Sequence, residues 1–106
     1  MQQVVAATYM APEVVAYIVE LVAATRQHPA FARGASPRAT LAVTAMSKSI
    51  AQLRGRDFVV PKDVQEVFGY TVAHRLLLSQ HAESEGVTAA AVLQQILGSI
   101  SAPKLR

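Results

Sequence analysis

The sequence predicts an all-α protein, a compact bundle of about four helices with short extended connectors. Two observations support this prediction. Apolar residues make up 52% of the 106-residue chain, and the excess is largely alanine and valine, with no tryptophan. This composition favours closely packed helices. Apolar residues also recur at helical spacing in segments bounded by proline, glycine, serine or threonine, the usual start and stop residues of helices. The length fits one domain.

The first helix is expected to run from Ala11 or Pro12 to Gln27. Proline fits a first turn, where no amide donor is needed, and Pro29 ends the helix. The expected inward stripe follows spacings of three and four and consists of Val14, Tyr17, Ile18, Leu21 and Val22. Because carboxylates interrupt this apolar stretch, it is read as a buried helix, and no membrane association is expected.

A loop is expected over residues 28–35, followed by a second helix. Ser36 is a good N-cap and Pro37 suits the first helical position. Gly55 is placed to end the helix. Small residues on the inward stripe should let a neighbouring helix approach closely. That stripe is expected to consist of Ala42, Ala45, Met46, Ser49, Ile50 and Leu53.

The remainder predicts two further helices. Residues 58–60 form a short extended piece, and Pro61 opens a third helix with Asp63 complementing the dipole of its first turn. Its expected inward stripe is Val64, Val67, Phe68, Thr71 and Val72. The polar residues 80–86 break the helical pattern, and Thr88 caps a fourth helix. Its expected inward residues are Val92, Leu93, Ile96 and Leu97.

Common catalytic patterns do not occur in the sequence. There is no G-x-x-x-x-G-K-[ST] phosphate loop, no G-x-G-x-x-G and no H-E-x-x-H. The three histidines lack a cysteine or paired carboxylate at ligand spacing, so no metal site is expected. The chain by itself is therefore expected not to be an enzyme.

The basic residues are concentrated in one part of the chain. Between Leu21 and Arg56 there is no carboxylate, and the net charge of the whole chain is +3. The six cations of this block are Arg26, Arg33, Arg38, Lys48, Arg54 and Arg56. A block of one sign suggests an anionic partner; scattered solvated charges are the alternative. Outside the block, Arg75 is expected to pair with Asp57 or Asp63.

The segment GASPRA, residues 34–39, is the candidate site. Arg38 is expected at the second position of a helix, where free amides and the helix dipole already concentrate positive potential. An anion held jointly by the amides and the guanidinium would compensate for this charge. The alternative is an ordinary capped helix start with an exposed arginine.

The same segment resembles the sensor 2 element of MoxR-family AAA+ ATPases, whose lid domains carry a G-x-S-P-R-A pattern. Other segments resemble further lid elements of that family, in the family's order, from about Val14 to Pro103. They are YIVELV at 17–22 with Thr25 and Arg26, RGRDFVVPKDV at 54–64, AHRL at 73–76 and EGV at 85–87.

The resemblance implies a lid domain over residues 11–103, after the end of a linker at 1–10 and before a tail at 104–106. The ATPase core of the family, with its Walker A and B motifs and arginine finger, has no counterpart in the sequence, so an excised or truncated domain is expected. The resemblance implies ATP and magnesium as cofactors of the full-length protein, with none for the chain alone. It also implies a cytoplasmic, chaperone-like machine. Its expected partners are the core of the same chain, neighbouring ring subunits and a von Willebrand A-domain protein.

The resemblance also assigns roles to residues. Arg38 would contact the γ-phosphate of ATP and report hydrolysis through lid movement, with Ser36 and Pro37 close to the nucleotide. Two further positions have open alternatives. Tyr17 and Ile18 would lie near the adenine or in the bundle core. For Arg26 the alternatives are a phosphate, a neighbouring subunit or solvent.

Two function classes compete with the lid. The first is a small basic helical nucleic-acid-binding domain that uses residues 26–56 and binds with a steep salt dependence. Only Phe31 and Phe58 are available there for stacking, which disfavours it. The second is a self-associating helical scaffold, suggested by the apolar excess.

Overall fold

The computed structural model describes residues 8–104. Residues 1–7 of the expected linker and 105–106 of the expected tail lie outside the described part. The predicted all-α bundle is confirmed, with one small two-stranded sheet added. The elements are α2 (Pro12–Gln27), β1 (Phe31–Arg33), α3 (Ala39–Leu53), α4 (Pro61–Val72), η1 (Ala73–Arg75), β2 (Leu77–Leu78), α5 (Gln80–Ser84) and α6 (Ala89–Ser99).

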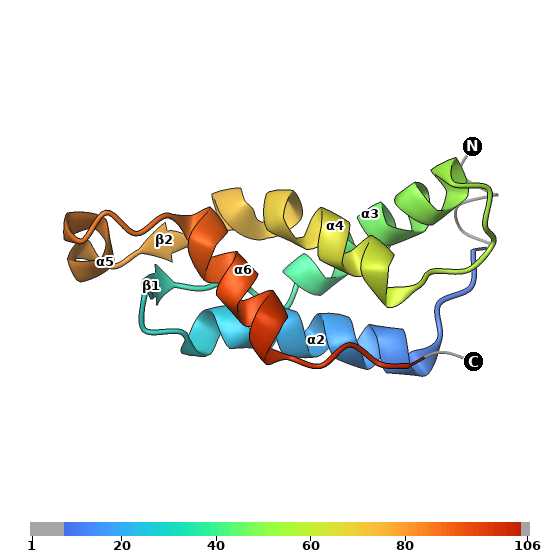
Figure 1. Cartoon of the computed structure of the whole chain (residues 1–106), viewed down its shortest axis with the longest axis horizontal. Coiled ribbons are helices and arrows are strands. Elements are labelled where there is room, and N and C mark those ends of the chain that lie inside the picture. The colour runs from blue at the N-terminus through green and yellow to red at the C-terminus, as the bar shows by residue number, and fades with distance from the viewer. Residues whose placement is uncertain (1–7, 105–106) are drawn as a thin grey trace.

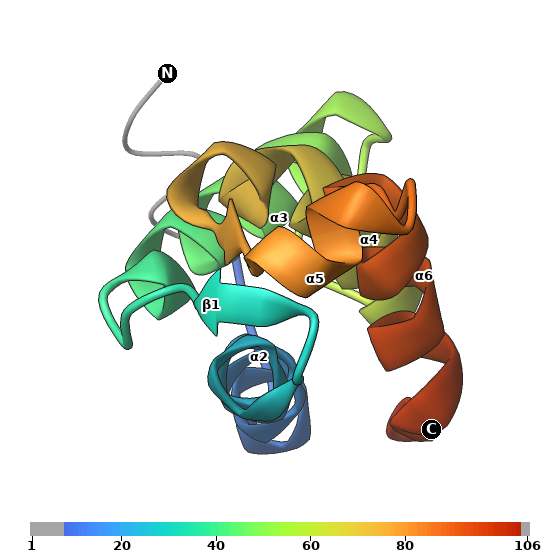
Figure 2. The same cartoon turned by 90° about the vertical axis from the view of Figure 1, so that its left-hand side faces the viewer.

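The helices form two layers (Figures 1 and 2). Helix α2 lies below α3 and α4, which pack along each other, and α6 crosses one side of the bundle. The short elements β1, β2 and α5 gather at one end, and the first and last described residues lie at the other (Figure 1). Among residues 8–104, none of the helices combines the length and apolar character needed to cross a membrane.

Three of the four predicted helices have the predicted inward faces. All five residues of the α2 stripe and all five of the α4 stripe are buried. In α6, Val92, Leu93 and Ile96 are buried and Leu97 is partly buried. The hydroxyl of Thr88 accepts a hydrogen bond from the Ala91 amide at 3.2 Å, which is the predicted N-cap.

The predicted inward face of α3 is wrong. The buried residues follow a spacing of four and are Ala39, Val43, Ser47 and Ala51. Leu53 is 82% exposed and Met46 is 45% exposed, although both were expected inside. The true stripe consists of small and medium-sized side chains on the helix that packs against α4. The size and hydrophobicity of a side chain alone therefore do not determine which face of α3 is buried.

The start of α3 also differs from the prediction. Helix α3 begins at Ala39, with Arg38 rather than Ser36 in the N-cap position and no side-chain cap. The amides of residues 39–41 donate to the carbonyls of Ser36, Pro37 and Arg38 at 2.9–3.1 Å. These i to i+3 bonds form a tight turn of the 3₁₀ type before the helix.

Two segments predicted as irregular contain structure. Strand β1 pairs antiparallel with β2, Phe31 opposite Leu78 and Arg33 opposite Leu77. The polar stretch after Ser79 forms the short helix α5, because the Ser79 hydroxyl accepts a hydrogen bond from the Ala82 amide at 3.1 Å. Strands of two or three residues are too short to produce an alternating sequence pattern, so the sheet could not be foreseen.

The turn between α3 and α4 is fixed by a buried carboxylate. Asp63 is fully buried and accepts two hydrogen bonds from Arg56, each 2.7 Å, and one from the Val60 amide at 2.9 Å. Arg54 lies 3.5 Å from Asp63 and also pairs with Glu66 on the surface. Asp63, predicted to complement the helix dipole, thus also joins the turn to the first turn of α4.

The surroundings of Asp63 oppose one another in their effect on its pKa. Burial of the carboxyl raises the pKa, while hydrogen bonds from Arg56 and Val60 and the charges of Arg56 and Arg54 lower it. The lowering effects prevail, so the pKa lies below the ordinary value of 3.8. The ionised form is therefore stabilised in the folded chain.

We expect Asp63→Asn to lower the free energy of unfolding by about 3 kcal/mol at pH 7, because it leaves two arginines without their buried partner. A carboxylate with a lowered folded pKa stabilises the fold above its unfolded pKa and loses this effect as the pH falls through the folded value. The difference from the parent should therefore shrink as the pH falls below 3.8. Urea denaturation over a pH series measures it.

The matched control for this experiment is Glu66→Gln. Its ion pair with Arg54 is partly exposed, so its loss should cost less than about 1 kcal/mol. A difference between Asp63→Asn and the parent that stays constant down to acid pH would contradict the assigned role of the carboxylate.

A second prediction concerns Ser47, whose buried hydroxyl has no hydrogen-bond partner among the described residues. We expect Ser47→Ala to raise the free energy of unfolding by about 1 kcal/mol, because it removes an unsatisfied polar group and alanine favours helix. Ala51→Ser, one turn later on the same buried stripe, should lower it. Thermal and urea denaturation measure both. A clear loss of stability in Ser47→Ala would show that the hydroxyl has a partner.

Candidate functional site

The candidate segment 34–39 leaves β1 and passes the last turn of α2 in very close contact. A Cβ atom on Gly34 would lie 2.4 Å from the carbonyl oxygen of Thr25 and 2.5 Å from the amide nitrogen of Arg26. No side-chain carbon fits at such distances from backbone, so this position needs glycine. The glycine of the GASPRA segment is therefore explained by packing against α2.

The backbone of the next residue, Ala35, is bound through both its amide and its carbonyl by the same helical turn. The hydroxyl of Thr25 accepts a hydrogen bond from the Ala35 amide at 2.9 Å and donates one to the Val22 carbonyl at 2.6 Å. The Nη1 atom of Arg26 donates to the Ala35 carbonyl at 3.0 Å. Thr25 and Ala35 are both fully buried. We call the Thr25 and Arg26 contacts with Ala35 the α2 clamp.

The three residues that follow the clamp are exposed. Ser36 and Pro37 form the turn before α3, and Arg38 occupies the N-cap position in a helical conformation, φ −62° and ψ −26°. Within residues 8–104 the Arg38 side chain has no ion pair or hydrogen bond, and the first turn of α3 contains no acidic residue. The guanidinium therefore lies free at the positive end of a 15-residue helix.

The chemistry of this helix start differs in one respect from the expectation. An anion was expected to bind the free amides and the guanidinium together. The amides of residues 39–41 instead donate to the carbonyls of residues 36–38. Within residues 8–104 the amides of Ser36 and Arg38 have no hydrogen bond, so these two amides and the guanidinium are the groups of this segment available to an anion, the guanidinium by charge-assisted hydrogen bonds.

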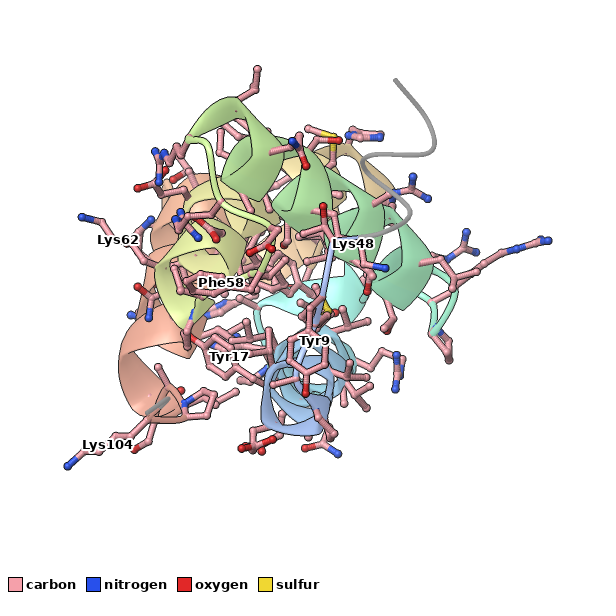
Figure 3. All side chains as sticks on the ribbon, turned by 90° about the vertical axis from the view of Figure 1, so that its right-hand side faces the viewer. Tyr9, Tyr17, Lys48, Phe58, Lys62 and Lys104 are labelled. Atoms are coloured by element: carbon pink, nitrogen blue, oxygen red, sulfur yellow. The ribbon has the colours of Figure 1, made fainter. Side chains whose placement is uncertain are left out.

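Tyr17 and Ile18 lie in the bundle core, one of the two alternatives for them. Tyr17 is 2% exposed and Ile18 fully buried. The Tyr17 hydroxyl accepts a hydrogen bond from the Gln65 side chain at 3.2 Å and so joins α2 to α4. Figure 3, which looks onto the end with the termini, shows Tyr17 between the helices. In this arrangement both residues stabilise the bundle.

Several cations of the basic block are used inside the chain. Arg26 donates to the Ala35 carbonyl, and Arg54 and Arg56 pair with Asp63. The others, without a hydrogen bond or ion pair in the described part, are Arg33, Arg38 and Lys48. The block therefore presents much less free positive charge than its sequence suggests.

Arg75 was predicted to pair with Asp57 or Asp63, and this is wrong. Its Nε atom donates to the Thr71 carbonyl at 3.3 Å. Asp63 is already saturated by arginines of the preceding turn. The Arg75 contact satisfies a carbonyl at the end of α4, as basic residues often do there.

A hollow of about 680 Å³ lies at the end with the termini and was not foreseen from the sequence. It is lined by Tyr9, Ala11, Glu13, Asp57, Phe58, Val59 and Lys104. Tyr9 and Phe58 are joined by a parallel bridge, with hydrogen bonds of 2.8 and 2.9 Å to the flanking residues. Figure 3 shows both rings at this end, with Lys62 and Lys104 extending outward. None of the predicted site residues lines the hollow.

Comparisons with known proteins agree with this fold. The sequence profile of the AAA lid domain family matches residues 23–96. A relative from Bacillus subtilis, the uncharacterized protein YeaC, is 39% identical over 85% of this chain and 28% of its own length. The chaperone MoxR1 of Mycobacterium tuberculosis is 33% identical over 99% of this chain and 30% of its own length.

A solved structure shows the same fold. The crystal structure of a "putative ATPase" from Cytophaga hutchinsonii matches 97% of this chain with a TM-score of 0.91 and 28% sequence identity. The match covers 34% of that protein, so the chain spans about a third or less of each relative's length. Since the family profile covers most of the chain and the fold agrees, the chain belongs to the AAA lid domain family, in the form found in MoxR-type AAA+ proteins.

Proposed function

We propose that residues 11–103 act as the sensor 2 lid of a MoxR-type AAA+ ATPase. The lid closes over ATP bound to a separate α/β core and couples hydrolysis to its own movement. The observation that carries this proposal is the guanidinium of Arg38, which is exposed and has no hydrogen bond or ion pair within residues 8–104, three residues after the α2 clamp. A mobile cation would lose conformational entropy on binding, whereas one on a fixed segment loses less.

The proposed role of Arg38 follows from arginine chemistry. A guanidinium binds phosphate through paired hydrogen bonds and keeps its charge at any physiological pH. Contact with the γ-phosphate stabilises the closed lid, and loss of that phosphate removes the contact. The difference in binding energy between ATP and ADP then shifts the lid between two positions.

The proposal extends to residues near Arg38 and to the cofactor. Ser36 and Pro37 lie beside the nucleotide because they form the turn that presents Arg38. ATP with magnesium is the cofactor of the full-length protein, and the chain alone performs no catalysis. The Nη1 atom of Arg26 donates to the Ala35 carbonyl, so Arg26 holds the segment from its α2 side.

The proposed partners are the core of the same chain and neighbouring subunits of a ring. The outer face of α3 and α4 supports the need for a partner, since Leu41, Met46 and Tyr70 are largely exposed there. A groove of about 480 Å³ between these helices is lined by Ala42, Ala45, Met46, Tyr70, Thr71, His74 and Arg75. Apolar surface of this kind marks contact sites in soluble proteins. A von Willebrand A-domain partner and a cytoplasmic, chaperone-like role belong to the same proposal by family resemblance.

The nucleic-acid alternative receives little support. Three of its cations bind acceptors within the chain. Phe58, one of its two stacking rings, lies at the hollow near the termini, with Arg56 over its face at 5.7 Å. Binding to phosphate backbones needs several free cations on one face, and this arrangement does not provide them.

We expect Arg38→Ala, in a full-length ATPase that carries this lid, to reduce ATP turnover about 100-fold or more, because the transition-state charge loses a cationic partner. The chain should stay folded, since the side chain is exposed and makes no hydrogen bond or ion pair within residues 8–104. Steady-state hydrolysis and thermal denaturation measure the two effects.

The matched control is Arg33→Ala, which removes a neighbouring exposed arginine without a partner in the described part. It should leave turnover near the parent value. Normal turnover in Arg38→Ala would remove Arg38 from the sensor role. If the 106-residue chain itself binds single-stranded DNA or RNA tightly, with a steep salt slope, the nucleic-acid alternative takes its place.

A further inference from the structure

We infer that Thr25 is a positioning residue for Arg38: its hydroxyl makes the last turn of α2 and the start of α3 one rigid unit. This inference rests on the proposed function and adds to it. The sequence of the sensor 2 segment alone does not show this connection to α2. Besides the close packing of Gly34 and the Arg26 contact, the connection depends on the Thr25 hydroxyl, which accepts a hydrogen bond from the Ala35 amide ten positions later.

The geometry limits motion at this junction in three ways. The Thr25 hydroxyl is fixed by its own bond to the Val22 carbonyl, so its lone pair is directed at the Ala35 amide. The Nη1 atom of Arg26 donates to the carbonyl of the same residue, Ala35. Gly34 is in van der Waals contact with the helix backbone, with no room for even a methyl group.

The contacts that hold the backbone of Ala35 also restrain Arg38. Between them lie Ser36 and Pro37, and the proline fixes one of the few backbone angles left. The turn bonds from residues 36–38 to residues 39–41 then connect this segment to α3. A tilt of α2 relative to the ATPase core would therefore move the guanidinium of Arg38 along with α2, as lid movement requires.

Loss of the buried Thr25 hydroxyl should destabilise the segment that follows. Without the Thr25 oxygen, the Ala35 amide is buried and lacks an acceptor. The segment would move to reach water, and Arg38 would move with it. A displacement of about 1 Å at a phosphate contact can reduce a rate about 100-fold.

The test uses variants that differ in one atom group. Thr25→Val keeps the shape and removes both hydrogen bonds, while Thr25→Ser keeps the hydroxyl. Ser99→Ala is the matched control, because the Ser99 hydroxyl also donates to a carbonyl three residues earlier in its own helix, that of Ile96 at 3.0 Å, but holds no loop. Each is made in the full-length ATPase, with and without Arg38→Ala.

We expect Thr25→Val to lower turnover about 10- to 100-fold, and Thr25→Ser and Ser99→Ala to stay near the parent. In the Arg38→Ala background, Thr25→Val should have no further effect, because the positioned group is gone. An equal loss in both backgrounds, or an equal loss from Ser99→Ala, would overturn the inference.

A second measurement separates this inference from the sensor proposal. Hydrogen exchange and amide NMR shifts of the 106-residue chain report the junction directly. With Thr25→Val, the Ala35 amide should exchange at least about tenfold faster, with shifts concentrated at residues 35–39. If Arg38→Ala leaves turnover normal, the sensor role fails but this measurement still tests the junction; an unchanged Ala35 amide overturns the positioning role by itself.

Discussion

The arrangement of the site depends on the backbone of Ala35, whose amide and carbonyl both bind side chains from the last turn of α2. This contact links the first helix of the lid to the second at the position where the exposed arginine follows. Glycine at position 34 is required by the same closeness. The Thr-Arg pair in the last turn of α2 and the GASPRA segment thus form one structural unit, although Ala35 lies nine positions after Arg26.

A second junction fixes the other end of α3. The buried carboxylate of Asp63 binds Arg56 and approaches Arg54, and Gly55 between them adopts a positive φ of 74°. The basic block thus contains both paired and unpaired cations. Arg54 and Arg56 pair with Asp63, whereas Arg38, like Arg33 and Lys48, has no hydrogen bond or ion pair within residues 8–104. Because a paired charge contributes little to binding outside ligands, these three cations are the candidates, and family resemblance selects Arg38 among them.

The sequence predicted the parts of the fold that depend on long patterns. Helices α2, α4 and α6 have apolar stripes of several turns with proline or threonine at their starts, and their faces were predicted correctly. The face of α3 was not, because Met46 and Leu53 are large and apolar yet the helix packs through Ala39 and Ser47. Strands β1 and β2 have no pattern long enough to detect. The apolar periodicity within α3 does not show that α4 packs against the face of α3 that carries its small residues.

The assignment of the site to Arg38 came from resemblance, and it stays a prediction. Resemblance pointed to Arg38 and to the Thr-Arg pair as separate elements, but no spacing rule connects a hydroxyl to an amide ten residues later. The sharing of an anion by amides and guanidinium also stays a prediction, although the turn of residues 36–38 occupies the amides of residues 39–41. In the proposed role, the affinity for a phosphate depends on where the guanidinium is held. If the buried contacts of Thr25 and Ala35 set that place, as we infer, then a residue that does not itself bind the phosphate belongs to the site.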